Sequence, residues 1–593
     1  MCGIALIHGP RPDRAAFRQM IGSLAPRGEV EETLLTDRLL AGTQRLRIVD
    51  AERAVQPFTS ADGRWVLCYN GEIFNYRMLQ AELTSLSHRL RTDSDTEVVL
   101  EAFLEWGAGA VSRLRGEFAF ALADTAADRV YLARDPLGVK PLYWSRRDGC
   151  LHVASEIKAL TPFGAPVSEV PPGHHGWAEG GWAQASWAGA GGPDAATGPA
   201  LEPYVDLLRL GDGQPLIEDA DEAAKLVRAA LEDSIRVRVD TGLTVGVILS
   251  GGLDSTLALM HVREMHPDCV AFTIGAPASK DLLYARRLTA DLGVPHEVIE
   301  VRPRDIRLAD IREAIRLGEL TEYGDIINEV ISVPLFRRIH QMGIKVVLSG
   351  DGSDELFGGY PMYFRASPEQ ARRLFQHKIR NLCRTELQRL DRASMGHGTE
   401  LRVPFLDLSL VELAMRLPRG LKQRDGQDKW ILREAFADLL PDYIRRRPKD
   451  MMSYSSGLHE RARLFKPLYP RLYRSSGYGL LEPMRRDFDT VLERCGHDLD
   501  RAIADSAARP DYTLAERARD LAGAARWNAV LAVRERIPGR LSARLGPGLG
   551  PRVSGPRLDE GPDDLGGPLV RRGTVRLAAR IVVAPAAADR LHH

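Results

Sequence analysis

The sequence predicts a multidomain protein of mixed α/β and α+β class, with a layered first domain and a second domain built on a parallel sheet. Residues 1–165 alternate short β-rich runs with turn signals. Residues 216–537 alternate strand-like and helix-like runs, which is typical of a parallel sheet. Between the two, periodicity is lost over residues 166–215. At 593 residues the chain is also too long for a single hydrophobic core.

The first domain, residues 1–165, contains four β-rich runs and one clear helical pattern. The apolar spacing of TEVVLEAFLEWG, residues 96–107, suits a helix packed on a sheet. The strand predictions fall on CGIALIH, RWVLCYNGEIF, FAFALAD and RVYLARD. These elements predict a layered domain of sheets and helices.

The second domain, residues 216–537, begins with a helical pattern and continues as strands and helices in alternation. The helix is expected in EAAKLVRAALEDSIRVRV, and the strands in TVGVIL, CVAFTI and KVVLSG. The segment before it, residues 166–215, is rich in Gly, Ala and Pro and is expected to be an irregular connector. The segment after it, residues 538–593, is too rich in Gly and Pro to build a core and is expected to be mostly disordered.

Composition narrows the function classes. Hydrophobic residues make up 44% and charged residues 27%, and no run approaches the roughly 20 apolar residues of a membrane-spanning helix. Lys plus Arg equals Asp plus Glu at 80 each, which argues against nucleic-acid or membrane partners. The six cysteines lack paired or metal-ligand spacing, and the N-terminus lacks a signal-peptide pattern. We expect a soluble, cytoplasmic protein with small-molecule partners, and leave a homodimer open.

Cys2 carries the first chemical pattern. Removal of the initiator methionine would place a thiol and a free α-amine on one residue, so that the amine can activate the thiol. Cys2 alone would more often be an ordinary strand residue. It is accompanied, however, by RLRIVD at 45–50, QPF at 56–58, YNGEIFNY at 69–76 and SDTE at 94–97.

This set resembles the glutaminase domain of class II amidotransferases, an αββα sandwich with an N-terminal nucleophile, in the form fused to asparagine synthetases. The resemblance implies that Cys2 attacks the side-chain amide of glutamine, and that Asn70 and the Gly71 N–H form the oxyanion hole. It implies that Arg45 binds the glutamine α-carboxylate, and that Asp95 and Glu72 bind its α-ammonium. The family's His-Arg-Gly-Pro-Asp segment is replaced by Pro26 to Val30 here, which predicts an altered rim.

The second pattern is SGGLDS, residues 250–255, between an apolar strand and a helix. Its glycines allow close approach to phosphate, and the helix N-terminus supplies free N–H groups. Two glycines between a strand and a helix often make only a structural turn, but the full SGGLDS resembles the pyrophosphate loop of ATP pyrophosphatases. That resemblance implies cleavage of ATP between its α and β phosphates.

KVVLSGDGSDELFGGY, residues 345–360, and the later runs DRASMGHGTELRVPFLD, LPRGLKQRDGQDKWILREAF and RRRPKDMMSYSSGLHE resemble the asparagine synthetase domain. The resemblance implies that Asp254 and Asp354 hold Mg²⁺ and that Asp351 lies near the activated carboxylate. Lys429 and Lys449 would contact the phosphates. In isolation such carboxylates are often helix caps, and such lysines are usually solvated. The expected nucleotide pocket comprises Ser250, Gly251, Gly252, Ser255, Ile274, Ser349 and Gly350, with Asp281 as a further candidate.

Joined, the two patterns predict a glutamine-dependent carbon–nitrogen ligase that consumes ATP and Mg²⁺. Ammonia released at Cys2 would attack an acyl-adenylate, through an apolar internal passage that prevents its protonation. Aspartate would give asparagine, AMP and pyrophosphate. Two alternatives stay open: the same chemistry on a peptide or specialised metabolite, and a non-catalytic protein with relic domains.

Overall fold

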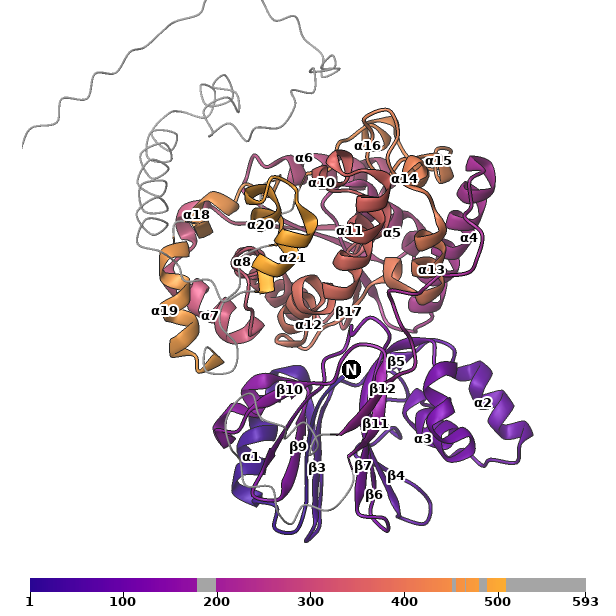
Figure 1. Ribbon diagram of the computed structural model, residues 1–593, viewed down its shortest axis with the longest axis vertical. Coiled ribbons are helices and arrows are strands. Elements are labelled where there is room, and N and C mark those ends of the chain that lie inside the picture. Colours follow the sequence, from indigo (N-terminus) through magenta and orange to yellow (C-terminus); the bar gives the residue numbers. More distant parts are fainter. Residues whose placement is uncertain (179–198, 451–454, 464, 479–487, 508–593) are drawn as a thin grey trace, which may run out of the picture. The chain divides into compact units, whose positions relative to one another are not determined.

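The computed structural model describes residues 1–178, 199–450, 455–463, 465–478 and 488–507 (Figure 1). The predicted tail, residues 538–593, lies outside the described residues. No helix in the described ranges combines the length and apolar character needed to cross a membrane.

Two antiparallel six-stranded sheets form the N-terminal half of the described chain. The first has the order β10-β8-β9-β1-β3-β2, and the second has the order β12-β11-β7-β6-β5-β4. The strands of the first sheet are β1 (Cys2–His8), β2 (Val30–Leu35), β3 (Leu39–Arg45), β8 (Tyr143–Arg147), β9 (Cys150–Ala154) and β10 (Val167–Glu169). Those of the second are β4 (Phe58–Thr59), β5 (Trp65–Ile73), β6 (Gly116–Asp124), β7 (Arg129–Arg134), β11 (His174–Ala178) and β12 (Ala200–Pro203).

Helices cover the outer faces of the two sheets (Figure 1). Helix α1 (Arg14–Ser23) packs on the first sheet, whereas α3 (Asp95–Trp106) packs on the second and is accompanied by α2 (Tyr76–Ser85). Apolar residues of β1, such as Ile4 and Leu6, meet those of β5 and β6 between the sheets. This αββα sandwich confirms the predicted fold class and places the ends of β1 and β5 together.

Part of the segment expected to be an irregular connector is instead strand. β10 adds to the edge of the first sheet, while β11 pairs with β7 and β12 in the second. These strands have only three to five residues, too few to show an alternating pattern in sequence. The Trp177 ring packs against Tyr131 and Phe103, which anchors β11 to the domain.

A parallel five-stranded sheet organises the second half, in the order β15-β14-β13-β16-β17. Its strands are β13 (Val245–Ile248), β14 (Val270–Gly275), β15 (His296–Glu300), β16 (Val346–Leu348) and β17 (Glu400–Arg402). The larger helices around it are α4 (Ala220–Arg238), α5 (Leu253–Met265), α6 (Lys280–Leu292), α7 (Leu308–Gly318), α8 (Tyr323–Gln341), α11 (Pro368–Asn381), α12 (Gln388–Met395) and α13 (Leu408–Arg416). Shorter or more C-terminal helices are α9 (Ser353–Phe357), α10 (Pro361–Arg365), α14 (Arg419–Lys422), α15 (Trp430–Ala435), α16 (Asp442–Arg445), α18 (His459–Arg463), α19 (Tyr469–Ser475), α20 (Phe488–Arg494) and α21 (Leu499–Ala507).

The predicted parallel sheet is therefore confirmed. Its central strands β13 and β16 are short and apolar, as expected where both faces of a sheet are covered. Because parallel strands end at one edge, the turns after β13, β14 and β16 meet there, and this is where ligands bind in such sheets.

Candidate active sites

Cys2 begins β1 and is buried between the two antiparallel sheets. Its backbone N–H donates to Asn70 Oδ1 at 2.9 Å, which joins the start of β1 to β5. The amide nitrogen of Asn70 is buried and has no hydrogen-bond partner among the described residues. A buried donor without a partner is costly, so this one suits an oxygen that arrives with a ligand. Gly71 follows Asn70 on β5.

The environment of the Cys2 thiol suppresses its ionisation. Burial raises the pKa of the thiol, although the positive charges of the chain's amino terminus and Arg45 act in the opposite direction. Gln56 Nε2 lies 3.7 Å from Cys2 Sγ. The thiol therefore needs a base to become a nucleophile at neutral pH.

The three expected glutamine-binding side chains differ in their partners. Arg45 lies directly opposite Cys2 in the β1–β3 ladder and pairs with Glu32. Asp95, at the start of α3, accepts from the Tyr69 hydroxyl at 2.6 Å and from a backbone N–H of β5.

Glu72 contacts the parallel-sheet half of the chain. It lies 3.4 Å from Arg402 of β17, in the parallel-sheet half, and burial raises its pKa to about 8. The structure thus brings Arg45 beside Cys2 but directs Glu72 toward the other half of the chain.

The SGGLDS turn joins β13 to α5 at the carboxyl edge of the parallel sheet. Gly251 has φ of +67°, a conformation that side chains rarely tolerate, and Gly252 caps α5. The Ser250 and Ser255 hydroxyls lie 3.2 Å apart, which closes the turn. The turn leaves the first N–H groups of a thirteen-residue helix available to an anion.

Ile274 near the end of β14 and Ser349-Gly350-Asp351 after β16 flank this turn on the same edge. A Cβ on Gly350 would lie 2.7 Å from the Asp254 Cβ, so the two turns can approach this closely only because position 350 is glycine. A pocket opens beside them, lined by Ser250, Gly252, Leu253, Asp254, Asp281, Asp428, Lys429, Arg433, Arg447, Pro448, Lys449 and Asp450.

Two carboxylates and two lysines meet beside that pocket, whose lining includes Asp254, Lys429 and Lys449 but not Asp354. Lys429 Nζ contacts both Asp254 and Asp354, and lies 2.6 Å from the latter. Lys449 pairs with Asp354 from a different loop. Although burial opposes ionisation, Lys429 and Lys449 lower the pKa of Asp354 to about 2. The carboxylates of Asp254 and Asp354 are therefore already arranged around the Lys429 ammonium.

Asp351 stands slightly apart from that cluster. Its carboxylate lies 3.3 Å from Arg389 of α12, and burial raises its pKa. Arg389 also pairs with Glu386 at 2.7 Å and donates to Ser332 at 3.2 Å. Asp281 lines the pocket beside the SGGLDS turn and pairs with Arg447 at 2.8 Å.

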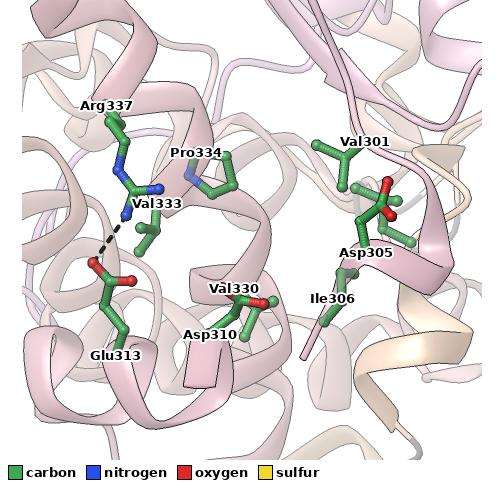
Figure 2. Close-up of a pocket in the computed structure, with 10 residues that line it drawn as sticks. Val301, Asp305, Ile306, Asp310, Glu313, Val330, Val333, Pro334 and Arg337 are labelled. Carbon is green, nitrogen blue, oxygen red and sulfur yellow. Dashed lines mark hydrogen bonds and ion pairs between the residues drawn. The ribbon is translucent and has the colours of Figure 1, made fainter. Parts of the chain in front are cut away.

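A separate hollow is lined partly by residues of α8. Figure 2 shows apolar Val330, Val333 and Pro334 facing Val301 and Ile306, with an ion pair between Arg337 and Glu313 at its margin. It contains none of the site residues expected from the sequence.

Comparison with known proteins agrees with this geometry. The "Glutamine amidotransferase domain" family matches residues 1–171, and "Asparagine synthase" matches residues 226–374 and 365–485. Asparagine synthetase B [glutamine-hydrolyzing] of Escherichia coli is 34% identical over 71% of this chain and 76% of its own length. A probable asparagine synthetase [glutamine-hydrolyzing] of Schizosaccharomyces pombe is 32% identical over 74% of this chain and 80% of its own length. The chain belongs to the asparagine synthetase family.

A member of this ligase family needs both of its sites in one structure. Buried charged residues connect the two halves of this chain. Arg27 donates to the Cys2 carbonyl at 3.2 Å and forms a two-point ion pair with Asp391 of α12, at 2.8 and 3.0 Å. Arg392 bonds Asp391 and the fully buried Glu319. Helix α12 thus contacts the surroundings of Cys2 through Asp391 and those of Asp351 through Arg389.

The altered rim of this asparagine synthetase relative is held by two contacts of Glu29. Glu29 N–H donates to the Arg45 carbonyl at 2.9 Å, and the Glu29 side chain pairs with Lys345 at 2.7 Å. Val30 begins β2, which carries Glu32. The replaced segment therefore forms ordered structure against the parallel-sheet half.

Several residues around the two sites were not identified from the sequence as site residues. Arg402 and Arg447 lie within motifs that resemble the family, and their charge beside those motifs is a usable signal. Arg389 and Glu32 have no local signal, because each is identified only by partners distant in sequence or on the neighbouring strand.

Proposed function

We propose that this ligase hydrolyses glutamine at Cys2 and uses the ammonia to amidate aspartate at the edge of the parallel sheet, with MgATP as the energy source. Two features within one unit of the described chain carry the proposal: the Asn70 amide nitrogen without a hydrogen-bond partner beside Cys2, and the Asp254–Asp354–lysine cluster. The names of the related proteins favour aspartate over another acid.

The glutaminase half of the proposal begins with loss of Met1. The freed Cys2 α-amine would lie beside Asn70 Oδ1 and act as the base, and the thiolate would attack the glutamine amide carbon. Asn70 Nδ2 and the Gly71 N–H would stabilise the oxyanion. Ammonia leaves, and water then releases glutamate from the thioester. Arg45 would bind the α-carboxylate of glutamine, and Asp95 and Glu72 would bind its α-ammonium.

In the synthetase half, Asp254 and Asp354 would hold Mg²⁺. They fit this role because both carboxylates already contact the single ammonium of Lys429, and oxygen ligands are what this ion prefers. The ion would neutralise the phosphate oxygens of ATP. Lys429 would then move with its positive charge to the phosphates, together with Lys449.

The turns beside the pocket would hold the nucleotide, with Ser250, Gly251, Gly252 and Ser255 around the pyrophosphate. Ile274, Ser349 and Gly350 would border the nucleoside. The acceptor carboxylate attacks the α-phosphorus and expels pyrophosphate. Ammonia then attacks the acyl carbon near Asp351, AMP leaves, and the new amide loses one proton.

Ammonia would travel between the sites inside the protein. The Met1 side chain packs with Leu46 and Met395, a small apolar cluster that joins the two halves of the described unit. Loss of Met1 would therefore open an apolar space directly beside the Cys2 amine. A dry, apolar route keeps ammonia unprotonated and nucleophilic.

We further propose the division of the chain at about residues 165, 215 and 537, and a cytoplasmic location. The test of function supplies glutamine, MgATP and a panel of carboxylic acids, and identifies amidated products by mass. Asparagine from aspartate supports the proposal. Formation of the amide of another acid, with none from aspartate, would show that the other acid is the substrate. Absence of pyrophosphate release with every acid would leave only a non-catalytic protein.

A Cys2→Ala variant tests the division of labour. It should lose synthesis from glutamine and retain synthesis from ammonium salts, because the synthetase site is intact. Loss of both activities in a folded variant would contradict two separate centres.

A further inference from the structure

Glu32 makes an ion pair with Arg45 on the neighbouring strand. In the β2–β3 ladder Glu32 stands opposite Thr43, and Arg45 stands opposite Val30, so that the two charged side chains share one face of the sheet. The two Glu32 oxygens lie 3.1 Å from Arg45 Nε and 3.2 Å from Arg45 Nη2. The side chains are 16% and 5% exposed, so the pair is largely shielded from water.

The hydrogen bonds of Arg45 leave part of its guanidinium available. A guanidinium has five N–H donors. Glu32 takes one on Nε and one on Nη2, and the carbonyl of Ala51 takes one on Nη1 at 3.0 Å. One donor therefore remains on each of Nη1 and Nη2, which is enough for a second carboxylate to bind at two points.

Glu32 also fixes a second wall of the Cys2 pocket. Its Oε2 accepts from the backbone N–H of Gln56 at 2.9 Å. The Gln56 side chain in turn reaches the Cys2 sulfur and accepts from the Tyr69 N–H at 2.9 Å. The Glu32 carboxylate thus holds both Arg45, which lies opposite Cys2, and Gln56, which contacts the Cys2 thiol.

We propose that Glu32 is a positioning residue for the donor amide: it holds Arg45 by the Nε edge so that the remaining Nη donors receive the α-carboxylate of glutamine. This inference rests on the proposed glutaminase function. The competing interpretation is that Glu32 occupies the substrate carboxylate's own place and must be displaced. The bond to Gln56 N–H and the location on a regular strand favour a fixed support over a displaceable group.

The test compares Glu32→Gln with Glu31→Gln as a matched control. Glu31 lies next to Glu32 on β2, and its carboxylate accepts from the Gln44 side chain at 2.7 Å. Three donors are used: glutamine, 4-aminobutanamide, which lacks the α-carboxylate, and glutaramate, which lacks the α-amine. Ammonia-dependent synthesis and thermal unfolding are measured in parallel.

For Glu32→Gln we expect kcat/KM to fall about ten-fold or more with glutamine and glutaramate, mainly through KM, because a charge-assisted contact is weakened. With 4-aminobutanamide it should change by less than about three-fold, since that donor makes no carboxylate contact. Glu31→Gln should match the wild type with all three donors, and ammonia-dependent synthesis should be unchanged in both variants. If Glu32→Gln does not fold, Glu32→Asp keeps the charge but shortens the reach to Arg45 and to Gln56 N–H, and should show the same order of losses among the three donors.

Three results would overturn the inference. A lower KM for glutamine would mean that Glu32 competes with the substrate. An equal loss with all three donors would mean a general structural role, and no change would mean no role. A wild-type enzyme that hydrolyses no glutamine would refute the proposed function itself, and is thereby distinguished from failure of this inference alone.

Discussion

Replacing Asp391 with leucine should destabilise the protein and disturb the Cys2 site together. Asp391 and Arg27 are 3% and 1% exposed and form a two-point ion pair. Removing one partner of such a pair typically costs about 3–5 kcal/mol, because the other charge stays buried without its counter-ion. Asp391 also pairs with the buried Arg392, but Glu156 remains 2.7 Å from Arg27 and Glu319 remains 3.1 Å from Arg392, so we expect a value near the lower end, about 3 kcal/mol.

The double variant Arg27→Met/Asp391→Leu isolates the interaction energy of this pair from the effects of the neighbouring residues. With both charges removed, the cost should be smaller than the sum of the two single costs by about 2 kcal/mol or more. Arg372 and Asp212 form an exposed pair for comparison, at 60% and 43% exposure, and Asp212→Leu should cost less than about 1 kcal/mol.

The assay is urea unfolding followed by circular dichroism, with glutamine hydrolysis and ammonia-dependent synthesis measured on the folded variants. Because Arg27 also holds the Cys2 carbonyl, glutamine hydrolysis should fall more than ammonia-dependent synthesis. Additive single costs, or a cost for Asp391→Leu no greater than that for Asp212→Leu, would refute the interpretation of this contact as a buried link between the halves.

Two further predictions concern lysines of the parallel-sheet half. Lys449→Met should reduce pyrophosphate release about 100-fold or more, since one preset charge at the phosphates is lost, while glutamine hydrolysis stays within about two-fold; equal losses would contradict the assignment. Burial lowers the pKa of Lys422 to about 7, with its ammonium 3.9 Å from the Phe375 ring centre. The ordinary pKa of lysine is 10.5, so between pH 7 and 10.5 Lys422 binds more protons in the unfolded chain than in the folded one. The folded wild type therefore gains stability as the pH rises through this range. Lys422→Met should therefore stabilise the protein more at pH 7 than at pH 10 in urea unfolding; equal shifts would show that the lysine is not neutral when buried.

Sequence patterns predicted those parts of the site that local structure dictates. A strand, a glycine-containing turn and a helix at residues 244–265 specify both the SGGLDS loop and its place at the sheet edge. The parallel pairing of β13 with β16 then brings Asp254 and Asp354 together. Ser353, the neighbour of Asp354, donates a hydrogen bond to the Asp254 carboxylate across 99 positions of sequence. Regular elements and their handed connections are enough for this inference.

Partner choice could not be predicted in the same way. Arg27 meets Asp391 across 364 positions, and Glu72 lies beside Arg402, a partner that its motif does not indicate. Such contacts depend on how two domains face each other, which no local pattern encodes. The strands β10 to β12 were missed for a different reason, because edge strands of three to five residues are stabilised by pairing and packing rather than by their own propensity.

The coupling of the two centres is tested most directly with isotope-labelled nitrogen. The enzyme is given glutamine labelled with ¹⁵N in its side-chain amide, MgATP and aspartate, in the presence of excess unlabelled ammonium. If ammonia passes internally from Cys2 to the acyl-adenylate, the asparagine amide carries ¹⁵N almost undiluted. Labelling at the ratio of the bulk ammonium pool would show that the nitrogen leaves the protein first, and would contradict the account.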